Sequence, residues 1–236
     1  MKAPHYGAFW KTLPKEFDRV EEVPPILYPD EPHLFMVSDV PPLPRVWFIA
    51  KGDQQLIQLQ RDRFLYNWKR PDPEGEYPEF ENIFPEFLRF LGQFRDFILN
   101  EGLGAVEFRQ FELTYVNHIP VKSIEGLLEC VSDVIADHVR DSSRERFLPK
   151  PGGYKWMTSY QLPDEMGQLH VTAQNARKKD DDEEILRLDL SARGVGNDTS
   201  DEGMKAWFGV AHDWIVHGFA DLTNEKIQDE IWGRKR

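Results

Sequence analysis

Hydrophobic residues recur along this chain at two spacings, one typical of strands and one typical of helices. Residues 45–51 and 56–60 predict two antiparallel strands, and Gly52-Asp53 between them predicts a tight turn. Ile57 and Leu59 lie at odd-numbered positions, whereas Phe64, Tyr66 and Trp68 lie at even-numbered ones. One regular strand cannot keep a single face buried through that change of parity. Residues 60–63 are therefore a turn or a bulge, and we favour a turn, which completes a three-stranded meander.

Spacings of three and four residues predict amphipathic helices. The first apolar stripe runs from Phe80 to Ile98. Because proline is tolerated only in the first turn of a helix, Pro85 places the start of regular helix near Phe84, and Gly102 ends it. Two more stripes predict helices over residues 123–139 and 204–222, the second with a terminal extension beyond Thr223.

The remaining apolar runs predict strands. A long strand is expected from Ala105 to Ile119, and shorter ones are expected at residues 34–37, 154–162, 169–173 and 186–190. The charged segment 177–184 joins the last two as an exposed, mobile hairpin tip. Strands and helices do not alternate singly, which argues against a doubly wound parallel sheet. We therefore expect an α+β fold, a mostly antiparallel sheet with long amphipathic helices packed on one face.

The order of these elements suggests three segments. Residues 1–32 contain six prolines and little periodicity, so they are expected to form an extended arm that lies across the surface or binds a neighbouring subunit. Residues 33–120 form a strands-helix-strand half, and residues 121–236 form a helix-strands-helix half. The halves are either parts of one continuous domain or the products of a duplication, although no residue-level repeat links them.

Composition narrows the classes of partner. The formal net charge of −12 argues against nucleic-acid binding, which usually needs a basic surface, and it opposes adsorption to anionic membranes. The chain has no apolar signal segment and no run long enough to span a membrane, so a cytoplasmic location is expected. The single cysteine, Cys130, lies among apolar residues of the expected helix 123–139 and is interpreted as a buried structural residue.

Two segments carry a resemblance to a known group of proteins. They are LIQLQRDRFLYNW, at residues 56–68, and YVNHIP, at residues 115–120. With a C-terminal helix like residues 212–223, they make the chain resemble an uncharacterised, sporadically distributed bacterial protein family of about this length. The resemblance covers most of the chain beyond the first thirty or so residues. It implies a prokaryotic origin and a shared fold, and it brings no established activity.

One group of polar residues is a candidate ligand site. It comprises Arg61, Arg63, Asn67, Asn117 and His118, which could meet at one end of the sheet. Arginine guanidinium groups grip carboxylate and phosphate groups through two parallel hydrogen bonds, so the ligand would be a phosphorylated or carboxylate-bearing small molecule. The competing interpretation is a buried turn network in which Asp62 pairs with an arginine and accepts hydrogen bonds from the backbone.

Other polar clusters point less clearly to chemistry. His212 and His217 are five residues apart on one expected helix, about 140° around its axis, so they do not share a metal ion without help. Asp213, His217 and Asp221 follow one another at four-residue steps and form either a solvated helix face or a weak acid–base cluster. No phosphate-binding loop, dinucleotide fingerprint or zinc-spaced set is present, and no cofactor or metal is expected.

The expected function follows from these observations. The leading hypothesis is a noncatalytic soluble protein that binds a protein partner or associates with itself. The alternative is an enzyme or ligand-binding domain for a phosphorylated or carboxylate-bearing small molecule. A third hypothesis is that the aromatic strands bind single-stranded nucleic acid by stacking bases on their rings. The competing interpretation is that these rings pack in the core between sheet and helix.

Overall fold

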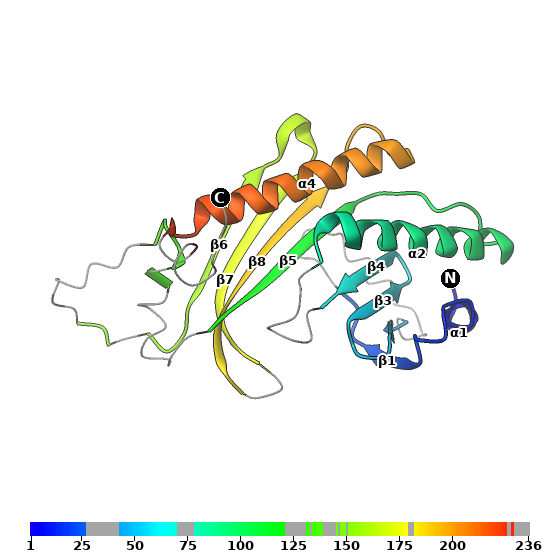
Figure 1. Ribbon diagram of the computed structural model, residues 1–236, viewed down its shortest axis with the longest axis horizontal. Helices are drawn as coiled ribbons and strands as arrows, with labels where there is room; N and C mark the ends of the chain where they lie inside the picture. The colour runs from blue at the N-terminus through cyan, green and yellow to red at the C-terminus, as the bar shows by residue number, and fades with distance from the viewer. Residues whose placement is uncertain are drawn as a thin grey trace, which may run out of the picture. The chain divides into compact units, whose positions relative to one another are not determined.

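The computed structural model describes residues 1–26, 43–69, 78–120, 131–132, 134–138, 145, 147–149, 151–178, 182–225 and 228. Two compact units follow one another along the chain, unit 1 at Met1–Glu107 and unit 2 at Phe108–Arg236. Each unit contains a four-stranded antiparallel sheet and at least one helix, which confirms the α+β class (Figure 1). Within the described ranges, no helix is both long enough and apolar enough to cross a membrane.

The sheet of unit 1 is a simple meander in the order β1-β2-β3-β4. Its strands are β1 (Arg19–Val23), β2 (Arg45–Ile49), β3 (Gln55–Gln60) and β4 (Arg63–Trp68). Both expected turns are confirmed, since β2 and β3 flank Gly52-Asp53, and β3 and β4 meet at residues 61–62. Gly52 and Asp53 both adopt left-handed φ values, 87° and 60°, as a tight hairpin requires. The expected three-stranded meander is therefore present, and β1 extends it.

The N-terminal segment departs from the expected extended arm. Ala3–Trp10 forms a helix, α1, and residues 19–23 form β1. Pro4 lies in the first turn of α1, where its missing N–H costs no helical hydrogen bond. The extended arm predicted from the number of prolines is therefore wrong for residues 3–10 and 19–23. Prolines at helix starts and in connections do not prevent the residues between them from forming a helix or a strand.

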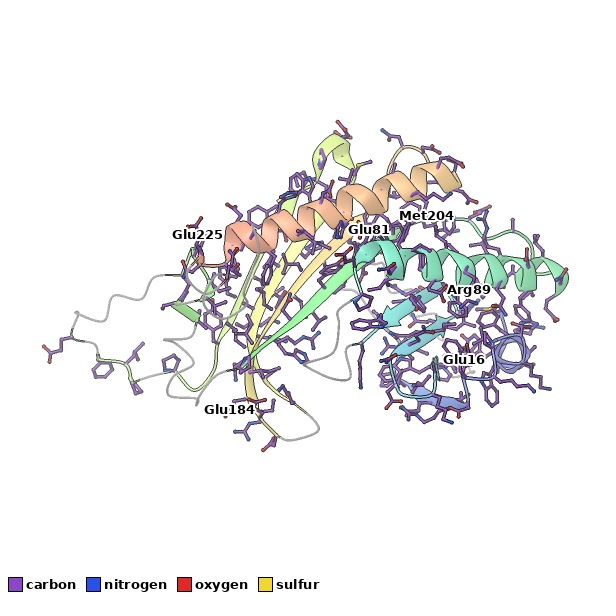
Figure 2. All side chains as sticks on the ribbon, in the orientation of Figure 1. Glu16, Glu81, Arg89, Glu184, Met204 and Glu225 are labelled. Carbon is purple, nitrogen blue, oxygen red and sulfur yellow. The ribbon has the colours of Figure 1, made fainter. Side chains whose placement is uncertain are left out.

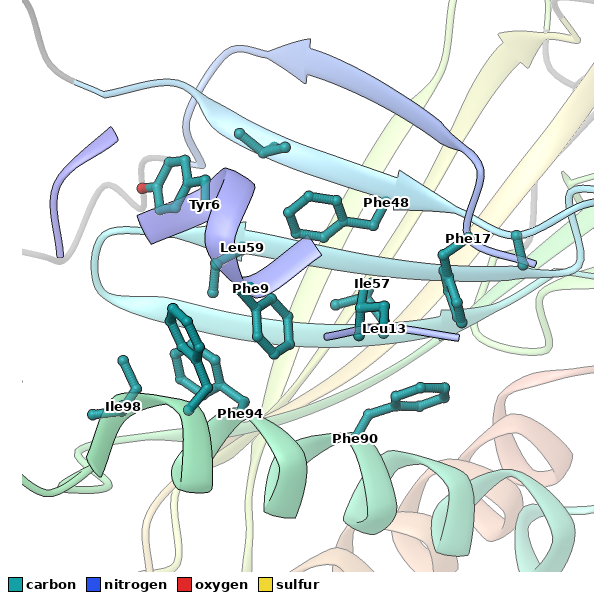
Figure 3. Close-up of a cluster of buried hydrophobic side chains, with 13 residues drawn as sticks. Tyr6, Phe9, Leu13, Phe17, Phe48, Ile57, Leu59, Phe90, Phe94 and Ile98 are labelled. Atoms are coloured by element: carbon teal, nitrogen blue, oxygen red, sulfur yellow. The ribbon is translucent and has the colours of Figure 1, made fainter. Parts of the chain in front are cut away.

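Phe9 of α1 lies at the centre of the apolar core of unit 1 (Figure 3). Its side chain is completely buried, and its ring packs edge-on against Phe48 and Phe94 at centroid distances of 6.0 and 5.3 Å. Its centroid is also 5.5 Å from that of Phe97. These contacts join α1, β2 and the second helix, so α1 is a structural part of unit 1.

The second helix, α2 (Phe80–Asn100), begins four residues earlier than expected and contains Pro85. A proline at that depth removes one backbone hydrogen bond. Stacked rings accompany this loss, since Phe84 lies 5.0 Å from Phe80 and 5.9 Å from Phe87. Farther along α2, Arg89 pairs with Glu86 and places its guanidinium over the Phe90 ring. Figure 2 labels Arg89 among the side chains of unit 1.

The sheet of unit 2 has a different strand order, β5-β8-β7-β6. Its strands are β5 (Phe111–Pro120), β6 (Lys155–Gln161), β7 (Gln168–Arg177) and β8 (Glu184–Gly194). The first strand pairs with the last, whereas in unit 1 every strand pairs with its neighbour in sequence. The two halves therefore do not share a topology, contrary to the suggestion of two similar halves. The structure divides the chain before Phe108, whereas the sequence analysis places the boundary after residue 120. The boundary lies one strand earlier because β5 pairs with β8 and therefore belongs to unit 2.

β5 begins at Phe111, six residues after the expected start at Ala105. The register explains this, since Phe111 lies opposite Gly194, the last residue of β8. Residues 105–110 alternate in sequence like a strand, but none of the described strands forms a ladder with them. The expected strand at 34–37 and Cys130 lie outside the described residues, as do 179–181 of the hairpin tip and most of the helix at 123–139.

The last helix, α4 (Asp201–Leu222), lies along one face of the unit 2 sheet and contacts β5, β8 and β7 (Figure 1). Ser200 caps it by accepting a 3.1 Å hydrogen bond from the Gly203 amide. Its buried residues are Met204, Trp207, Phe208, Ala211, Ile215 and Leu222. A 3₁₀ turn, η1 (Pro163–Glu165), joins β6 to β7, and Trp207 Nε1 donates to the Met166 carbonyl beside it at 3.0 Å. The β6–β7 hairpin is thereby anchored to α4.

The burial of Phe9 yields the first prediction. Phe9→Ala should lower the free energy of unfolding by about 3–5 kcal/mol, because it removes a buried ring from a close-packed aromatic cluster. Urea denaturation followed by circular dichroism measures this. Leu99→Ala is the control, because Leu99 on α2 is 60 % exposed and its removal should cost less than about 1 kcal/mol. Equal losses in the two variants would contradict the placement of α1 in the core.

Candidate functional site

In unit 1, the face of the sheet that points away from the phenylalanine core carries a row of hydrogen-bonded side chains. Trp47 Nε1 donates to Gln58 Oε1 at 2.9 Å, and Gln58 Nε2 donates to Asn67 Oδ1 at 2.5 Å. These residues come from β2, β3 and β4, and Gln58 is 7 % exposed. The row satisfies buried amide groups and links the three strands.

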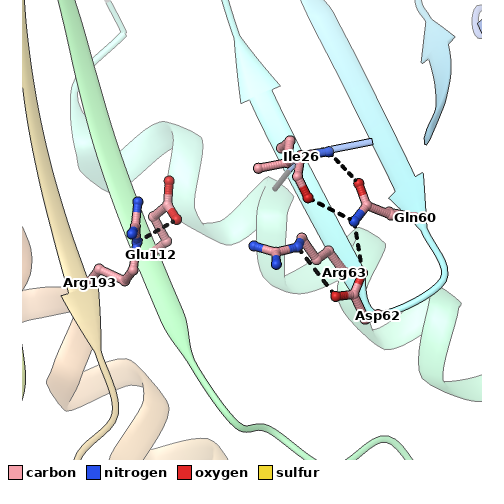
Figure 4. A network of polar contacts seen from close by, with 6 residues as sticks. All are labelled: Ile26, Gln60, Asp62, Arg63, Glu112 and Arg193. Carbon is pink, nitrogen blue, oxygen red and sulfur yellow. Dashed lines mark hydrogen bonds and ion pairs between the residues drawn. The ribbon is translucent and has the colours of Figure 1, made fainter. Parts of the chain in front are cut away.

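A second network lies at the turn between β3 and β4 (Figure 4). The Gln60 side chain accepts a 2.8 Å hydrogen bond from the Ile26 amide and donates to the Ile26 carbonyl at 3.2 Å. Gln60 also donates to Asp62 at 2.9 Å, and Asp62 pairs with Arg63 at 3.5 Å. Asp62 therefore pairs with an arginine, as the competing interpretation of a turn network expects, but its side chain is 58 % exposed and the hydrogen bonds to the Ile26 backbone come from Gln60.

The structure does not place the five predicted ligand residues in one unit. Arg61, Arg63 and Asn67 belong to unit 1, where Arg61 is exposed at the turn and the other two hydrogen-bond or pair within the sheet. Asn117 and His118 belong to unit 2 and point to opposite faces of β5, because successive strand residues alternate. Asn117 lies on the α4 side and donates to the Leu188 carbonyl at 3.2 Å.

The face of the unit 2 sheet opposite α4 gathers most of the polar side chains of that unit's strands. We call it the open face. It comprises even-numbered residues 112–118 of β5, odd-numbered residues 187–193 of β8, even-numbered residues 168–174 of β7 and odd-numbered residues 155–161 of β6. All are exposed or half-buried, and none of the described elements of unit 2 packs on them.

Cross-strand pairs fix the polar side chains of the open face. One row contains two hydrogen bonds, Thr114 with Ser191 at 2.6 Å and Ser159 with the His170 ring at 3.0 Å. Charged pairs flank that row. Arg193 binds Glu112 of β5 at 3.2 Å (Figure 4), and Arg187 binds Asp189, two residues along its own strand β8, at 2.8 Å. These side chains are therefore held in defined positions before any ligand arrives.

Two apolar side chains interrupt the open face. Val116 on β5 is 47 % exposed and Met157 on β6 is 64 % exposed. They belong to one row across the sheet, in which Asp189 and Thr172 separate them. The row therefore presents apolar surface near both margins of a polar face.

His118 is a histidine of the open face with a lowered pKa. Partial burial lowers its pKa below the ordinary value of 6.5, and the positive charges of Arg187 and Lys178 lower it further. The nearby Asp189 carboxylate acts in the opposite direction. His118 lies directly opposite Arg187, one of the positive charges that lower its pKa.

The histidines of α4 contact ordinary neighbours. The His212 ring lies 6.1 Å from that of Tyr115, and its Nδ1 is 3.8 Å from Asp213. His217 Nδ1 lies 2.8 Å from the Asp213 carbonyl of its own helix. Among the described residues, no three metal-ligating side chains come together. Of the strand aromatics, Phe64 and Tyr66 stack on α2 at 5.1 and 5.5 Å and belong to the core.

Sequence reasoning missed most of the open face. Its signal was present over residues 185–193, where Arg187, Asp189, Ser191 and Arg193 occupy the polar positions of an alternating strand. The strand expected at residues 186–190 rests on the leucines between them, and the sequence pattern predicts no role for the polar positions. Which polar residues become neighbours depends on pairing between strands distant in sequence, which alternation alone does not give.

Comparisons with known proteins found no matching family model, no matching curated protein and no matching solved structure. The resemblance to a sporadically distributed bacterial family therefore stays a prediction.

The Trp47–Gln58–Asn67 row generates a prediction about stability. Gln58→Ala should lower the free energy of unfolding by roughly 1–3 kcal/mol, because it leaves the Trp47 and Asn67 side chains without the partners they have at 2.9 and 2.5 Å. Thermal and urea unfolding measure the loss. Gln55→Ala, on the same strand, is the control and should change stability by less than about 0.5 kcal/mol. If the two variants lose equal stability, the row is not a structural network.

Proposed function

We propose that this protein is a noncatalytic binding protein and that its open face docks a protein partner. The observation that carries the proposal is the combination of a pre-arranged polar face with Val116 and Met157 exposed within it. Protein interfaces combine apolar contacts with hydrogen bonds and charged pairs in this way, and methionine is among the residues enriched in them. A four-stranded sheet offers the partner a broad platform.

Pre-arrangement supports binding because ordering side chains on association costs free energy. The hydroxyl pair of Thr114 and Ser191 and the ion pair of Arg187 and Asp189 already exist without a partner. Docking therefore has to order few side chains on this face.

The charge on the open face suggests the character of the partner. The face carries three basic residues, Lys155, Arg187 and Arg193, and two acidic ones, Glu112 and Asp189, a formal charge of +1 when the histidines are neutral. The whole chain carries −12. The open face is thus a nearly neutral, slightly basic area on an acidic protein, which suits a neutral or mildly acidic partner surface.

The N-terminal segment offers less support for docking than the expected extended arm would. Phe9, one of its apolar residues, is completely buried within unit 1. The binding proposal therefore rests on the open face rather than on residues 1–26.

Site-directed crosslinking tests the proposal. A photo-crosslinking amino acid at Met157 of the full chain should capture a partner in cells, and the same group at Asp213 should not. Asp213 lies on α4, and its side chain is 71 % exposed. The captured protein is then identified by mass spectrometry, purified and titrated calorimetrically. Val116→Glu combined with Met157→Glu should weaken its binding at least about tenfold, or about 1.4 kcal/mol. Equal capture from both positions, or unchanged affinity, contradicts the proposal.

A phosphorylated or carboxylate-bearing ligand is the second candidate, and one observation favours it. His118, Arg187, Gln174 and Lys155 form a single row across all four strands, three of them basic or able to become so. The positive charges of Arg187 and Lys178 lower the pKa of His118. An anion bound at this row would offset those charges and so raise that pKa.

Nuclear magnetic resonance of the His118 ring tests this second candidate. In chloride buffer the ring should titrate below 6.5, because partial burial and the positive neighbours disfavour the imidazolium form. Inorganic phosphate at matched ionic strength should raise that pKa if the row binds anions. Arg187→Gln, which removes a positive charge of the row, should abolish most of the phosphate effect. A titration that phosphate leaves unchanged excludes an anion site at this row.

A further inference from the structure

The outer edge of β6 has the properties of a strand that pairs with another strand. β6 is the last strand in the order β5-β8-β7-β6, and within the described residues it pairs only with β7. Two flanking hydrogen bonds show which backbone groups point inward. The Leu162 amide donates to the Gly167 carbonyl at 2.9 Å, and the Asn175 amide donates to the Tyr154 carbonyl at 3.1 Å.

Those two bonds determine the direction of every backbone group of β6. In an antiparallel ladder, residues of one parity direct both N–H and C=O to one neighbour, and residues of the other parity direct them to the opposite side. Even-numbered residues therefore face β7. Lys155, Met157, Ser159 and Gln161 direct their N–H and C=O groups to the outer edge.

The sequence of β6 contains little that would prevent this edge from pairing with another strand. Of the two edge strands of unit 1, β1 has three charged residues among its five, Arg19, Glu21 and Glu22, whereas β4 has one, Arg63, among its six. β6 has seven residues without a proline, and its one charge, Lys155, is at its first position. Natural edge strands are usually protected by charges, proline or a bulge. β1 follows that rule and β6 does not.

The sequence of β6 is also complementary to itself. We propose that β6 pairs antiparallel with β6 of a second copy, with a two-fold axis at Thr158, and joins the two unit 2 sheets into one. The odd-numbered, outward-facing residues then hydrogen-bond to each other, Met157 opposite Ser159 of the partner subunit and Lys155 opposite Gln161 of the partner subunit. The hydrogen-bond directions of β6 allow this register, and it uses the full length of the strand.

Side-chain pairing favours the same register. Trp156 lies opposite Tyr160 of the partner subunit, so two aromatic pairs form on the α4 side of the joined sheet, and Tyr160 is 37 % exposed in the single chain. Thr158 meets Thr158 of the partner subunit, a pairing that is favourable between strands. Lys155 never faces itself, and β6 carries no acid although the chain carries −12. The absence of like charges along the seam selects a second copy as the occupant.

The test uses the full chain and charge variants at the proposed axis. Sedimentation equilibrium should show a concentration-dependent dimer for the unmodified protein. Thr158→Lys and Thr158→Glu should each weaken the dimer at least about tenfold, because each places like charges directly opposite one another. An equimolar mixture of the two variants should restore a heterodimer, which also shows that both variants are folded. Ser159→Lys is the control, because residue 159 does not face itself, and it should still dimerise.

Three outcomes would overturn the proposal. They are a monomer at every concentration, a dimer that neither charge variant weakens, and charge variants that do not recombine. A monomer whose β6 amides become protected from hydrogen exchange only on binding another protein's peptide would assign the edge to that peptide instead. The proposal goes beyond docking on the open face, since Thr158 lies on the opposite face. A monomeric variant that still crosslinks its partner through residue 157 separates the two.

Discussion

The alternation of side chains along antiparallel strands is the constraint on which the rest of this structure depends. In each unit, alternation places one set of residues against a helix and the other set on the opposite face of the sheet. β8 shows this most clearly, with Leu186, Leu188 and Leu190 fully buried beneath α4 and Arg187 and Asp189 paired on the open face. The apolar set holds the fold together, and the polar set makes the surface available for binding.

The two units solve the problem of burying a sheet face differently. Unit 1 packs aromatic rings between its sheet and two helices, and Phe9 reaches into that core from the start of the chain. In the described part of unit 2, aliphatic strand residues pack under α4, which is anchored at one end by Trp207 and the β6–β7 turn. α4 contacts β5, β8 and β7, and β6 lies beyond those three in the strand order. Of the side chains of β6, Met157 is 64 % exposed and Tyr160 is 37 % exposed.

The polar residues of the two units have correspondingly different roles. In unit 1, Gln58, Asn67 and Gln60 bond to one another or to nearby backbone, and the two glutamines are buried. They connect strands and satisfy buried groups. In unit 2, the paired residues of the open face remain exposed or half-buried, so a partner can contact them. The exposure of its paired groups is what distinguishes a binding surface from a structural network here.

Local pattern in the sequence was enough to locate most elements. Alternation and turn residues placed β2, β3, β4 and the strands of unit 2, and helical spacing placed α2 and α4, because these signals come from residues close together in the chain. Element ends were less accurate where a distant partner decides them, as at Phe111, whose strand begins where Gly194 ends β8. The burial of Phe9 and the grouping of His118 with Arg187 and Lys155 depend on contacts across large sequence separations. Those contacts follow from packing and strand order, which only the tertiary structure decides, because short-range periodicity carries no information about which distant segments meet.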